Sequence, residues 1–317
     1  MLQKFLDKTD IKIVYELQKN ARTPISQIAK NSRISKQACY YRIKRLEEEL
    51  ILKYKTKINS SKLGYSSFCI YINLMNFTLE EEQELIKKVT SMKTVRWVVT
   101  STGIWDMMIA LGVKTNEEFN IELKKILNIF NEKLLNYETS IVLSTTDTWM
   151  KELEDIKELK EISEKETTQI DEKDKKILAL LKDDARLELT NISRQTNLSP
   201  EAVKYRINNL KKKEIIHSYS TKLNTEKLNL VWFQVQFLLK NITDEEEKKI
   251  LSKLKSIKEI AYILNLLGKW NFEVNLYCKD INVFRQTLLK IRELLGDKLK
   301  DYNTNIILKK HKGETQI

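Results

Sequence analysis

The stretch SKQACYYRIKRLE, residues 35–47, returns 164 positions later as SPEAVKYRINNLK, residues 199–211. In both copies a serine suited to capping a helix precedes apolar residues spaced three and four apart, which is the spacing of one buried helix face. Two shorter helical patterns come before it, one opening at Asp7 and the other at Thr23 and Pro24. Three helices, the last two joined by a very short turn, predict a helix-turn-helix domain.

The repeat extends far beyond this helix. Of 45 aligned positions in residues 7–51 and 171–215, fifteen are identical, and after one inserted residue Gly103 and Trp105 match Gly268 and Trp270. A match of this length, in order, indicates duplication of a whole unit.

The remainder of each unit alternates strand and helix patterns in the order βαββαβ, which predicts an antiparallel four-stranded sheet with two helices on one face. The expected fold class is therefore α+β, a tandem repeat of a helix-turn-helix domain and a ferredoxin-like sensor domain. We expect helix-turn-helix domains at 1–60 and 169–224, sensor or dimerisation domains at 61–148 and 225–317, and a charged connecting helix at 149–168.

The net charge of +12 is unevenly distributed. Residues 1–62 hold fifteen Lys and Arg against six Asp and Glu, so most of the excess lies on the first helix-turn-helix, as expected for a partner of double-stranded DNA. Three scattered cysteines without a Cys-x-x-Cys pair favour a reducing cytoplasm and argue against a structural zinc. Charges interrupt every apolar run, so no membrane span, metal or cofactor is expected.

At this point the chain resembles the Lrp/AsnC family of bacterial and archaeal regulators. The resemblance is carried by Leu6-Asp7, Ala21-Arg22, Ser35 and Arg42-Ile43, by Gly103-Ile104-Trp105-Asp106, and by the matching runs of the second copy. Family members usually carry one unit and dimerise, so the resemblance implies a fused pseudo-dimer in which strands at 51–58 and 215–223 pair. The number of chains per particle stays open.

Two departures from the family pattern stand out. A glycine usually follows the third helix, but Leu50 and Glu214 occupy that position. If the turn needs a left-handed residue, each substitution costs about 1 kcal/mol, unless the turn is built differently. The second sensor also has Asn271 where the first has Asp106, which predicts an altered or lost effector pocket.

We expect side chains of the third helices to select the DNA sequence, and Lys and Arg that contact phosphates to supply the affinity. We expect Tyr41 and Arg42 mainly to support their helix. The second helix is less basic, and Asn209 also lies on its outer face, so we expect unequal half-sites. The DNA-binding residues predicted are Lys36, Gln37, Tyr40, Tyr41, Arg42, Lys44 and Arg45 in the first unit and Ser199, Glu201, Lys204, Tyr205 and Asn208 in the second.

The sensor domains are expected to hold the effector, which the resemblance implies is an amino acid. Gly103 would allow a tight hairpin or a close backbone approach, and Asp106 would pair with an ammonium group, whereas Trp105 fits packing better. A module that only dimerises is the alternative. The residues predicted at the two hairpins are Gly103, Trp105, Asp106, Gly268, Trp270 and Asn271.

Two alternative hypotheses of function remain. Some sirohaem decarboxylases resemble fused tandem units of this fold, so the architecture alone does not exclude an enzyme. The sensor regions hold one histidine, His311, and no nucleophile–base arrangement emerges, so we expect no catalytic residues. Alternatively, the second helix-turn-helix binds protein rather than DNA.

Overall fold

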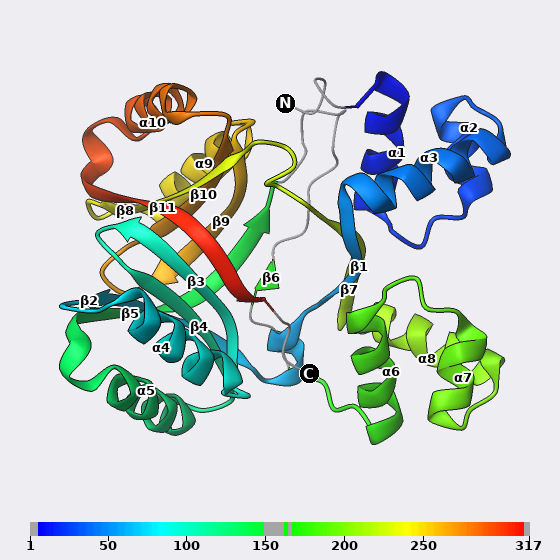
Figure 1. The fold of residues 1–317 in the computed structure, drawn as a ribbon, viewed down its shortest axis with the longest axis horizontal. Helices are drawn as coiled ribbons and strands as arrows, with labels where there is room; N and C mark the ends of the chain where they lie inside the picture. The colour runs from blue at the N-terminus through cyan, green and yellow to red at the C-terminus, as the bar shows by residue number, and fades with distance from the viewer. Residues whose placement is uncertain (1–5, 149–161, 164–166, 314–317) are drawn as a thin grey trace. The chain divides into compact units, whose positions relative to one another are not determined.

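The computed structural model describes residues 6–148, 162–163 and 167–313. The chain divides into two compact units, and each unit combines parts of both repeats. Unit 1 joins Met1–Gly64 to Glu166–Asn229, and unit 2 joins Tyr65–Lys165 to Leu230–Gln316. The two helix-turn-helix domains therefore lie in one unit, and the two sensor domains in the other (Figure 1).

Unit 1 contains two three-helix domains and the ribbon that follows them. Asp7 caps the first helix through its side chain, and Ser35 and Ser199 cap the two third helices in the same way. Each third helix leads into a strand. The elements are α1 (Lys8–Lys19), α2 (Ile25–Ser32), α3 (Lys36–Glu49), β1 (Ile51–Ile58), η2 (Ser60–Leu63), α6 (Glu172–Asp183), α7 (Leu189–Thr196), α8 (Pro200–Lys212) and β7 (Ile216–Leu223).

Strands β1 and β7 form a two-stranded antiparallel ribbon, which confirms the predicted pairing between the repeats. Each domain also contacts the strand of the other. The Ala21 N–H donates to the Tyr219 carbonyl at 3.1 Å, and the Ala185 N–H donates to the Tyr54 carbonyl at 3.3 Å. These reciprocal bonds hold the two helix-turn-helix domains to one ribbon as an internal pair.

Unit 2 contains two βαββαβ motifs, confirming the predicted fold class. In each motif the first strand pairs with the last and third strands, and the third pairs with the second. The elements are β2 (Ser66–Leu74), α4 (Leu79–Ser91), β3 (Val95–Gly103), β4 (Met107–Val113), α5 (Asn116–Phe130), η3 (Asn131–Lys133), β5 (Leu134–Asp147), β8 (Val231–Leu239), α9 (Asp244–Lys255), β9 (Ile260–Leu267), β10 (Phe272–Cys278), α10 (Ile281–Leu295), η5 (Gly296–Lys298) and β11 (Leu299–Gly313).

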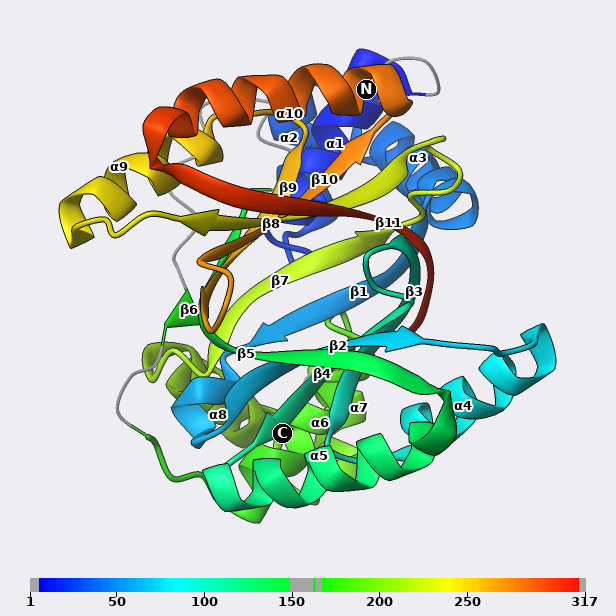
Figure 2. The same ribbon diagram turned by 90° about the vertical axis from the view of Figure 1, so that its left-hand side faces the viewer.

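The last strand of each motif is long and changes partner. β5 pairs first with β2 and then with β9, and β11 pairs first with β8 and then with β3. Eight strands therefore close into a ring. Figure 2 shows α9 and α10 on one side of this ring and α4 and α5 on the opposite side.

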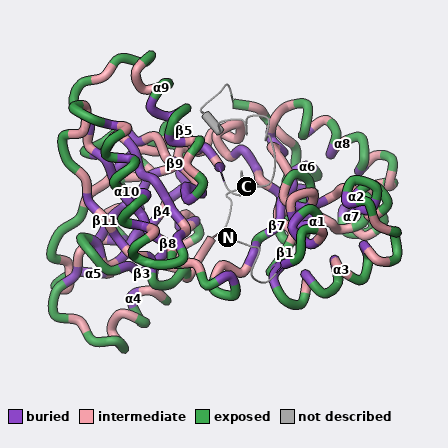
Figure 3. The backbone as a smooth tube through the Cα atoms, turned by 90° about the horizontal axis from the view of Figure 1, so that it is seen from above, coloured by how far each residue is buried: buried purple, intermediate pink, exposed green. Residues whose placement is uncertain are grey.

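Both faces of the strands are buried, and they differ in polarity. Along β8, Phe233, Val235 and Phe237 pack against the helices of the second motif, while Gln234 and Gln236 are fully buried on the face that alternates with them. Figure 3 shows the buried residues concentrated along these strands. The inner face is thus polar as well as apolar.

The polar part of the ring interior centres on Glu273, of which 3% is exposed. The Tyr71 hydroxyl donates to Glu273 Oε2 at 2.7 Å, and Asn275 Nδ2 donates to Oε1 at 3.1 Å. Burial raises the pKa of Glu273, and these hydrogen bonds oppose that rise. The residues that correspond to Glu273 and Asn275 in the first repeat are Met108 and Ala110, so the network is not symmetrical.

The helix predicted over 149–168 falls mostly outside the described residues. Of those described, Ile162–Ser163 form the short strand β6, which pairs with Ser144 and Thr145 of β5.

The turns after the third helices are unlike each other. Glu214 has φ +57°, in the left-handed region, whereas Leu50 has φ −134°. The missing glycine therefore costs conformational energy in the second repeat alone, because the first builds its turn differently.

Candidate DNA interface and effector hairpins

The outer face of α3 carries the predicted DNA-binding side chains. Lys36, Gln37, Lys44 and the two tyrosines are exposed, while Cys39, Ile43 and Leu46 are buried against α1 and α2. Tyr41 is 63% exposed, so the structure does not place it in the supporting role expected from the sequence. It stands outward beside Tyr40.

Two arginines of α3 turn back toward α1. Arg42 NH1 lies 2.6 Å from Asp7 Oδ2 and 2.8 Å from Asp10 Oδ1, and Arg45 NH2 contacts Asp10 Oδ2. The hydrogen bond from Arg42 holds the pKa of Asp7 below its usual range, and the same bonds raise the pKa of Arg42. Arg42 thus supports the helix as expected, while Arg45 combines an ion pair with a side chain that is 46% exposed.

The second domain repeats one of these contacts and lacks the other. Arg206 NH1 bridges Asp171 and Asp174 at 2.7 and 2.8 Å, but Asn209 stands where the first repeat has Arg45. The pKa of Asp171 is lowered, first by the Asp174 backbone N–H and then by Arg206.

The remaining predicted residues of α8 face outward. Glu201, Lys204, Tyr205 and Asn208 are exposed, and Tyr205 is 73% exposed. Ser199 caps the helix, because its side chain accepts the Ala202 N–H at 3.1 Å.

A basic face of the β1–β7 ribbon was missed by the sequence reasoning. Lys53, Lys55 and Lys57 alternate along β1, and Lys53 lies directly opposite Lys222 in the register. Burial and the neighbouring lysines lower the pKa of Lys55 to about 8. The alternation of lysine at every second position of a strand was the signal, since such residues share one face.

The first effector hairpin joins β3 to β4. Gly103 has φ +134°, and a Cβ there would lie 2.5 Å from the Thr304 carbonyl oxygen of β11. Its role is therefore a close approach between the two motifs. Trp105 is buried and its Nε1 donates to Gln236 Oε1 at 3.1 Å, which agrees with packing.

Asp106 and Asn271 perform the same structural task in the two hairpins. Asp106 Oδ2 accepts the Leu74 N–H at 2.7 Å, and Asn271 Oδ1 accepts the Leu239 N–H at 2.7 Å. One acceptor oxygen suffices for this bond, which explains how Asn can replace Asp. Asp106 is charged, however, and Asn271 is not. Burial and, as the smaller cause, the Asp106 carboxylate raise the pKa of Glu82 in the first motif.

The second hairpin joins β9 to β10. A Cβ on Gly268 would lie 2.7 Å from Ser140 Oγ of β5, so this glycine also permits a close approach between the motifs. Trp270 is buried and its Nε1 donates to Glu138 Oε2 at 3.0 Å.

The described residues contain no cluster of three His, Cys, Asp or Glu side chains placed to hold a metal ion. The three cysteines are buried free thiols. Within the same part of the chain, no helix is both long and apolar enough to cross a membrane.

Comparison with known proteins places this geometry in a family. A model described as winged helix-turn-helix DNA-binding matches residues 6–49 and 170–217. The HTH-type transcriptional regulator FL11 of Pyrococcus furiosus is 30% identical over 139 residues, which are 44% of this chain and 89% of the relative. The regulatory protein AsnC of Haemophilus influenzae is 28% identical over 40% of this chain and 85% of its own length. The chain belongs to the Lrp/AsnC family of DNA-binding transcription regulators.

Both Lrp/AsnC relatives are matched along most of their length by less than half of this chain, as expected if each carries one unit and this chain carries two. A solved structure matches the whole length. The siroheme decarboxylase NirDL superposes with a TM-score of 0.68 at 14% identity, covering 98% of this chain and 93% of that one. At this identity the likeness shows a shared fold alone.

Proposed function

We propose that the chain regulates transcription as an intramolecular pseudo-dimer whose α3 and α8 contact two half-sites of double-stranded DNA. The observation that carries the proposal is the β1–β7 ribbon, because it joins the two helix-turn-helix domains within one compact unit. In this family fold the third helix enters the major groove, and its outward side chains reach base edges.

The two faces differ in charge, so they should bind with unequal strength. On α3 the outer face presents Lys36, Lys44 and Arg45, whereas the equivalent positions of α8 are Pro200, Asn208 and Asn209. Lysine and arginine supply the phosphate attraction that asparagine lacks. The first domain is therefore the stronger half.

Two matched double variants test this inequality. Lys44→Ala with Arg45→Ala should weaken operator binding far more than Asn208→Ala with Asn209→Ala, in titrations at fixed salt. Each lost phosphate contact should also reduce the slope of log K against log salt by about one. Because Arg45 also pairs with Asp10, thermal melts of each variant must show an intact fold. Equal losses in the two variants contradict the proposal.

The length of the footprint separates DNA binding from protein binding by the second domain. Two engaged third helices protect half-sites whose centres lie about 34 Å apart, or a multiple of it. Protection of a single half-site indicates that the second domain binds protein.

We infer that the first sensor motif binds the ammonium group of an amino acid between Asp106 and Glu82. Burial and then the neighbouring Asp106 carboxylate raise the pKa of Glu82, and a cation between the two carboxylates would relieve their repulsion. In the second motif Asn271 is neutral, and Glu247 Oε1 already accepts from Asn265 Nδ2 at 2.7 Å. We therefore expect one effector per chain.

Calorimetry with the twenty amino acids tests this site. Asp106→Asn is the test variant that keeps the fold, because Asn271 shows that an amide at this position still accepts the strand N–H. The variant should fold and lose the effector. If Asp106→Asn removes no heat of amino-acid binding, the result supports a module that only dimerises.

We propose that the chain does not catalyse a reaction. The support is that relatives at 30–36% identity are named transcriptional regulators, while the decarboxylase shares 14% of its residues. Absorbance after incubation with sirohaem is the discriminating measurement. A bound and altered spectrum would favour the enzyme.

A further inference from the structure

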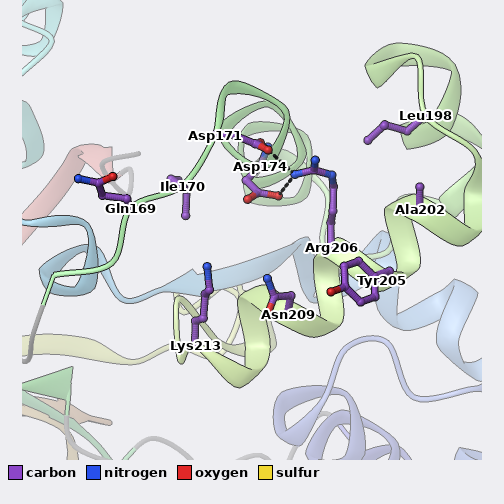
Figure 4. Close-up of a pocket in the computed structure, with 10 residues that line it drawn as sticks. All are labelled: Gln169, Ile170, Asp171, Asp174, Leu198, Ala202, Tyr205, Arg206, Asn209 and Lys213. Atoms are coloured by element: carbon purple, nitrogen blue, oxygen red, sulfur yellow. Dashed lines mark hydrogen bonds and ion pairs between the residues drawn. The ribbon is translucent and has the colours of Figure 1, made fainter.

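The second helix-turn-helix domain contains a pocket of about 530 Å³ between the start of α6 and the outer face of α8 (Figure 4). The lining residues are Gln169, Ile170, Asp171, Asp174, Leu198, Ala202, Tyr205, Arg206, Asn209 and Lys213. It is distinct from the effector hairpins, which lie in unit 2.

The first repeat shows what the equivalent place accommodates. There Asp10 receives two guanidinium groups, one from Arg42 at Oδ1 and one from Arg45 at Oδ2, and its side chain is 2% exposed. The second guanidinium thus completes the coordination of a buried carboxylate.

In the second repeat this guanidinium is missing. Arg206 donates to Asp174 Oδ1 at 2.8 Å, as Arg42 does to Asp10. Asn209 replaces Arg45, and within the described chain no arginine or lysine forms an ion pair with Asp174 Oδ2. The side chain of Asp174 is 12% exposed, against 2% for Asp10, and it lines the pocket. A largely buried carboxylate with one oxygen left without a guanidinium favours a charged donor.

A second substitution adds a positive charge to the same pocket. In the first repeat Arg45 Nε lies 3.9 Å from Glu49 Oε2, whereas the position equivalent to Glu49 is Lys213. Figure 4 shows the side chains of Asn209 and Lys213 extending from α8 toward the start of α6. The pocket therefore offers a carboxylate to a cation and an ammonium to an anion.

We propose that this pocket binds a ligand with a guanidinium group at one end and a carboxylate at the other. The guanidinium takes the place that Arg45 fills in the first repeat and donates to Asp174, and the carboxylate pairs with Lys213. Free arginine and a peptide ending in arginine both carry this chemistry. The guanidinium is favoured over an ammonium because its planar fork is the group that Asp10 already binds.

Calorimetry on the full-length chain uses L-arginine as the probe. We expect one site per chain, binding at least about tenfold weaker for L-citrulline, which replaces the guanidinium with a neutral urea, and also weaker for agmatine, which lacks the carboxylate. Acetyl-Gly-Gly-Arg with a free carboxylate separates the sources. Tighter binding of the peptide assigns the site to a protein partner, and tighter binding of L-arginine assigns it to the free amino acid.

Two reciprocal variants make the assignment specific. Asn209→Arg should abolish binding, because the new guanidinium reaches Asp174 as Arg45 reaches Asp10. Arg45→Asn with Glu49→Lys should raise the stoichiometry from one to two by creating the same pocket in the first repeat. Glu117→Gln, on the exposed start of α5 in unit 2, should leave binding of the probe unchanged.

Three results would overturn the proposal. They are no binding of either L-arginine or the peptide at 10 mM (about a hundredfold above a 0.1 mM site), binding unchanged in Asn209→Arg, and agmatine binding as tightly as L-arginine. The last rejects the role of Lys213.

Discussion

Replacing Glu273 with glutamine should change how the stability of unit 2 depends on pH. The carboxyl group is buried in the strand ring, and burial raises its pKa above the value of the unfolded chain. Between those two pKa values the folded state holds a proton that the unfolded state has released. The free energy of unfolding of the wild type should therefore fall as the pH rises from about 4.5 to the folded pKa.

The slope sets the magnitude. One group of this kind contributes at most about 1.4 kcal/mol for each pH unit, so between pH 5 and 7 the variant should gain up to about 2.7 kcal/mol on the wild type. Glutamine retains an oxygen that accepts from Tyr71 or Asn275, which keeps the polar contacts of the ring largely in place. The expected result is a flat curve for Glu273→Gln where the wild type declines.

Tryptophan fluorescence is a selective assay, because all five tryptophans lie in the residue ranges of unit 2. Denaturant titrations at several pH values give the slopes. Tyr71→Phe should lengthen the decline to higher pH, since the hydrogen bond from Tyr71 lowers the pKa of Glu273. Glu117→Gln, on the exposed start of α5, should change nothing. Parallel curves for the wild type and Glu273→Gln would refute the assignment of a buried, proton-binding carboxyl group.

Four further substitutions test local features of the backbone and the ribbon. Glu214→Gly should raise stability by about 1 kcal/mol in thermal melts, since Glu214 is left-handed, whereas Leu50→Gly should lower it by about 3 kcal/mol because Leu50 is buried and has negative φ. Gly103→Ala should destabilise unit 2 by about 1–3 kcal/mol, seen in tryptophan fluorescence, because its Cβ would meet the Thr304 carbonyl. Lys55→Met should remove a rise in stability between about pH 8 and 10.5, since wild-type Lys55 releases its proton on folding across that range; an unchanged pH profile by circular dichroism would contradict it.

The duplicated architecture was predictable because periodicity and repeated identities are local properties of the sequence. The apolar spacing around Ile43 and Ile207 placed both third helices, and the paired departures at Leu50 and Glu214 pointed to the turns. The pairing of β1 with β7 followed from the family resemblance and not from the strands themselves.

The closure of the strand ring could not be read in this way. β5 and β11 continue past their own motifs, and nothing in their composition states which edge they join. The polar interior was missed for the same reason, since Gln234 and Gln236 have no apolar periodicity to place them inside.

The candidate sites were predictable as residue sets but not as contacts. Arginine is a residue type that reads base edges, so Arg45 was predicted as a DNA contact. Its ion pair with Asp10, however, depends on the packing of α3 against α1. Aspartate is a residue type that binds ammonium groups, yet one oxygen of Asp106 already accepts the Leu74 N–H. The pocket beside Asn209 depends on how the start of α6 lies against α8, which no local sequence pattern states.

The closure of the ring by β11 also has a consequence for synthesis on the ribosome. Gly103 at the end of β3 is paired with Asn305 of β11, which is made some 200 residues later. At about 5–20 residues per second, the edge of β3 waits roughly 10–40 s for its partner. During that time the nascent first motif displays unsatisfied backbone donors and acceptors to other nascent chains. Edge-to-edge association is therefore expected while the chain is still growing, and a chaperone or slow initiation that spaces the ribosomes apart should improve the yield.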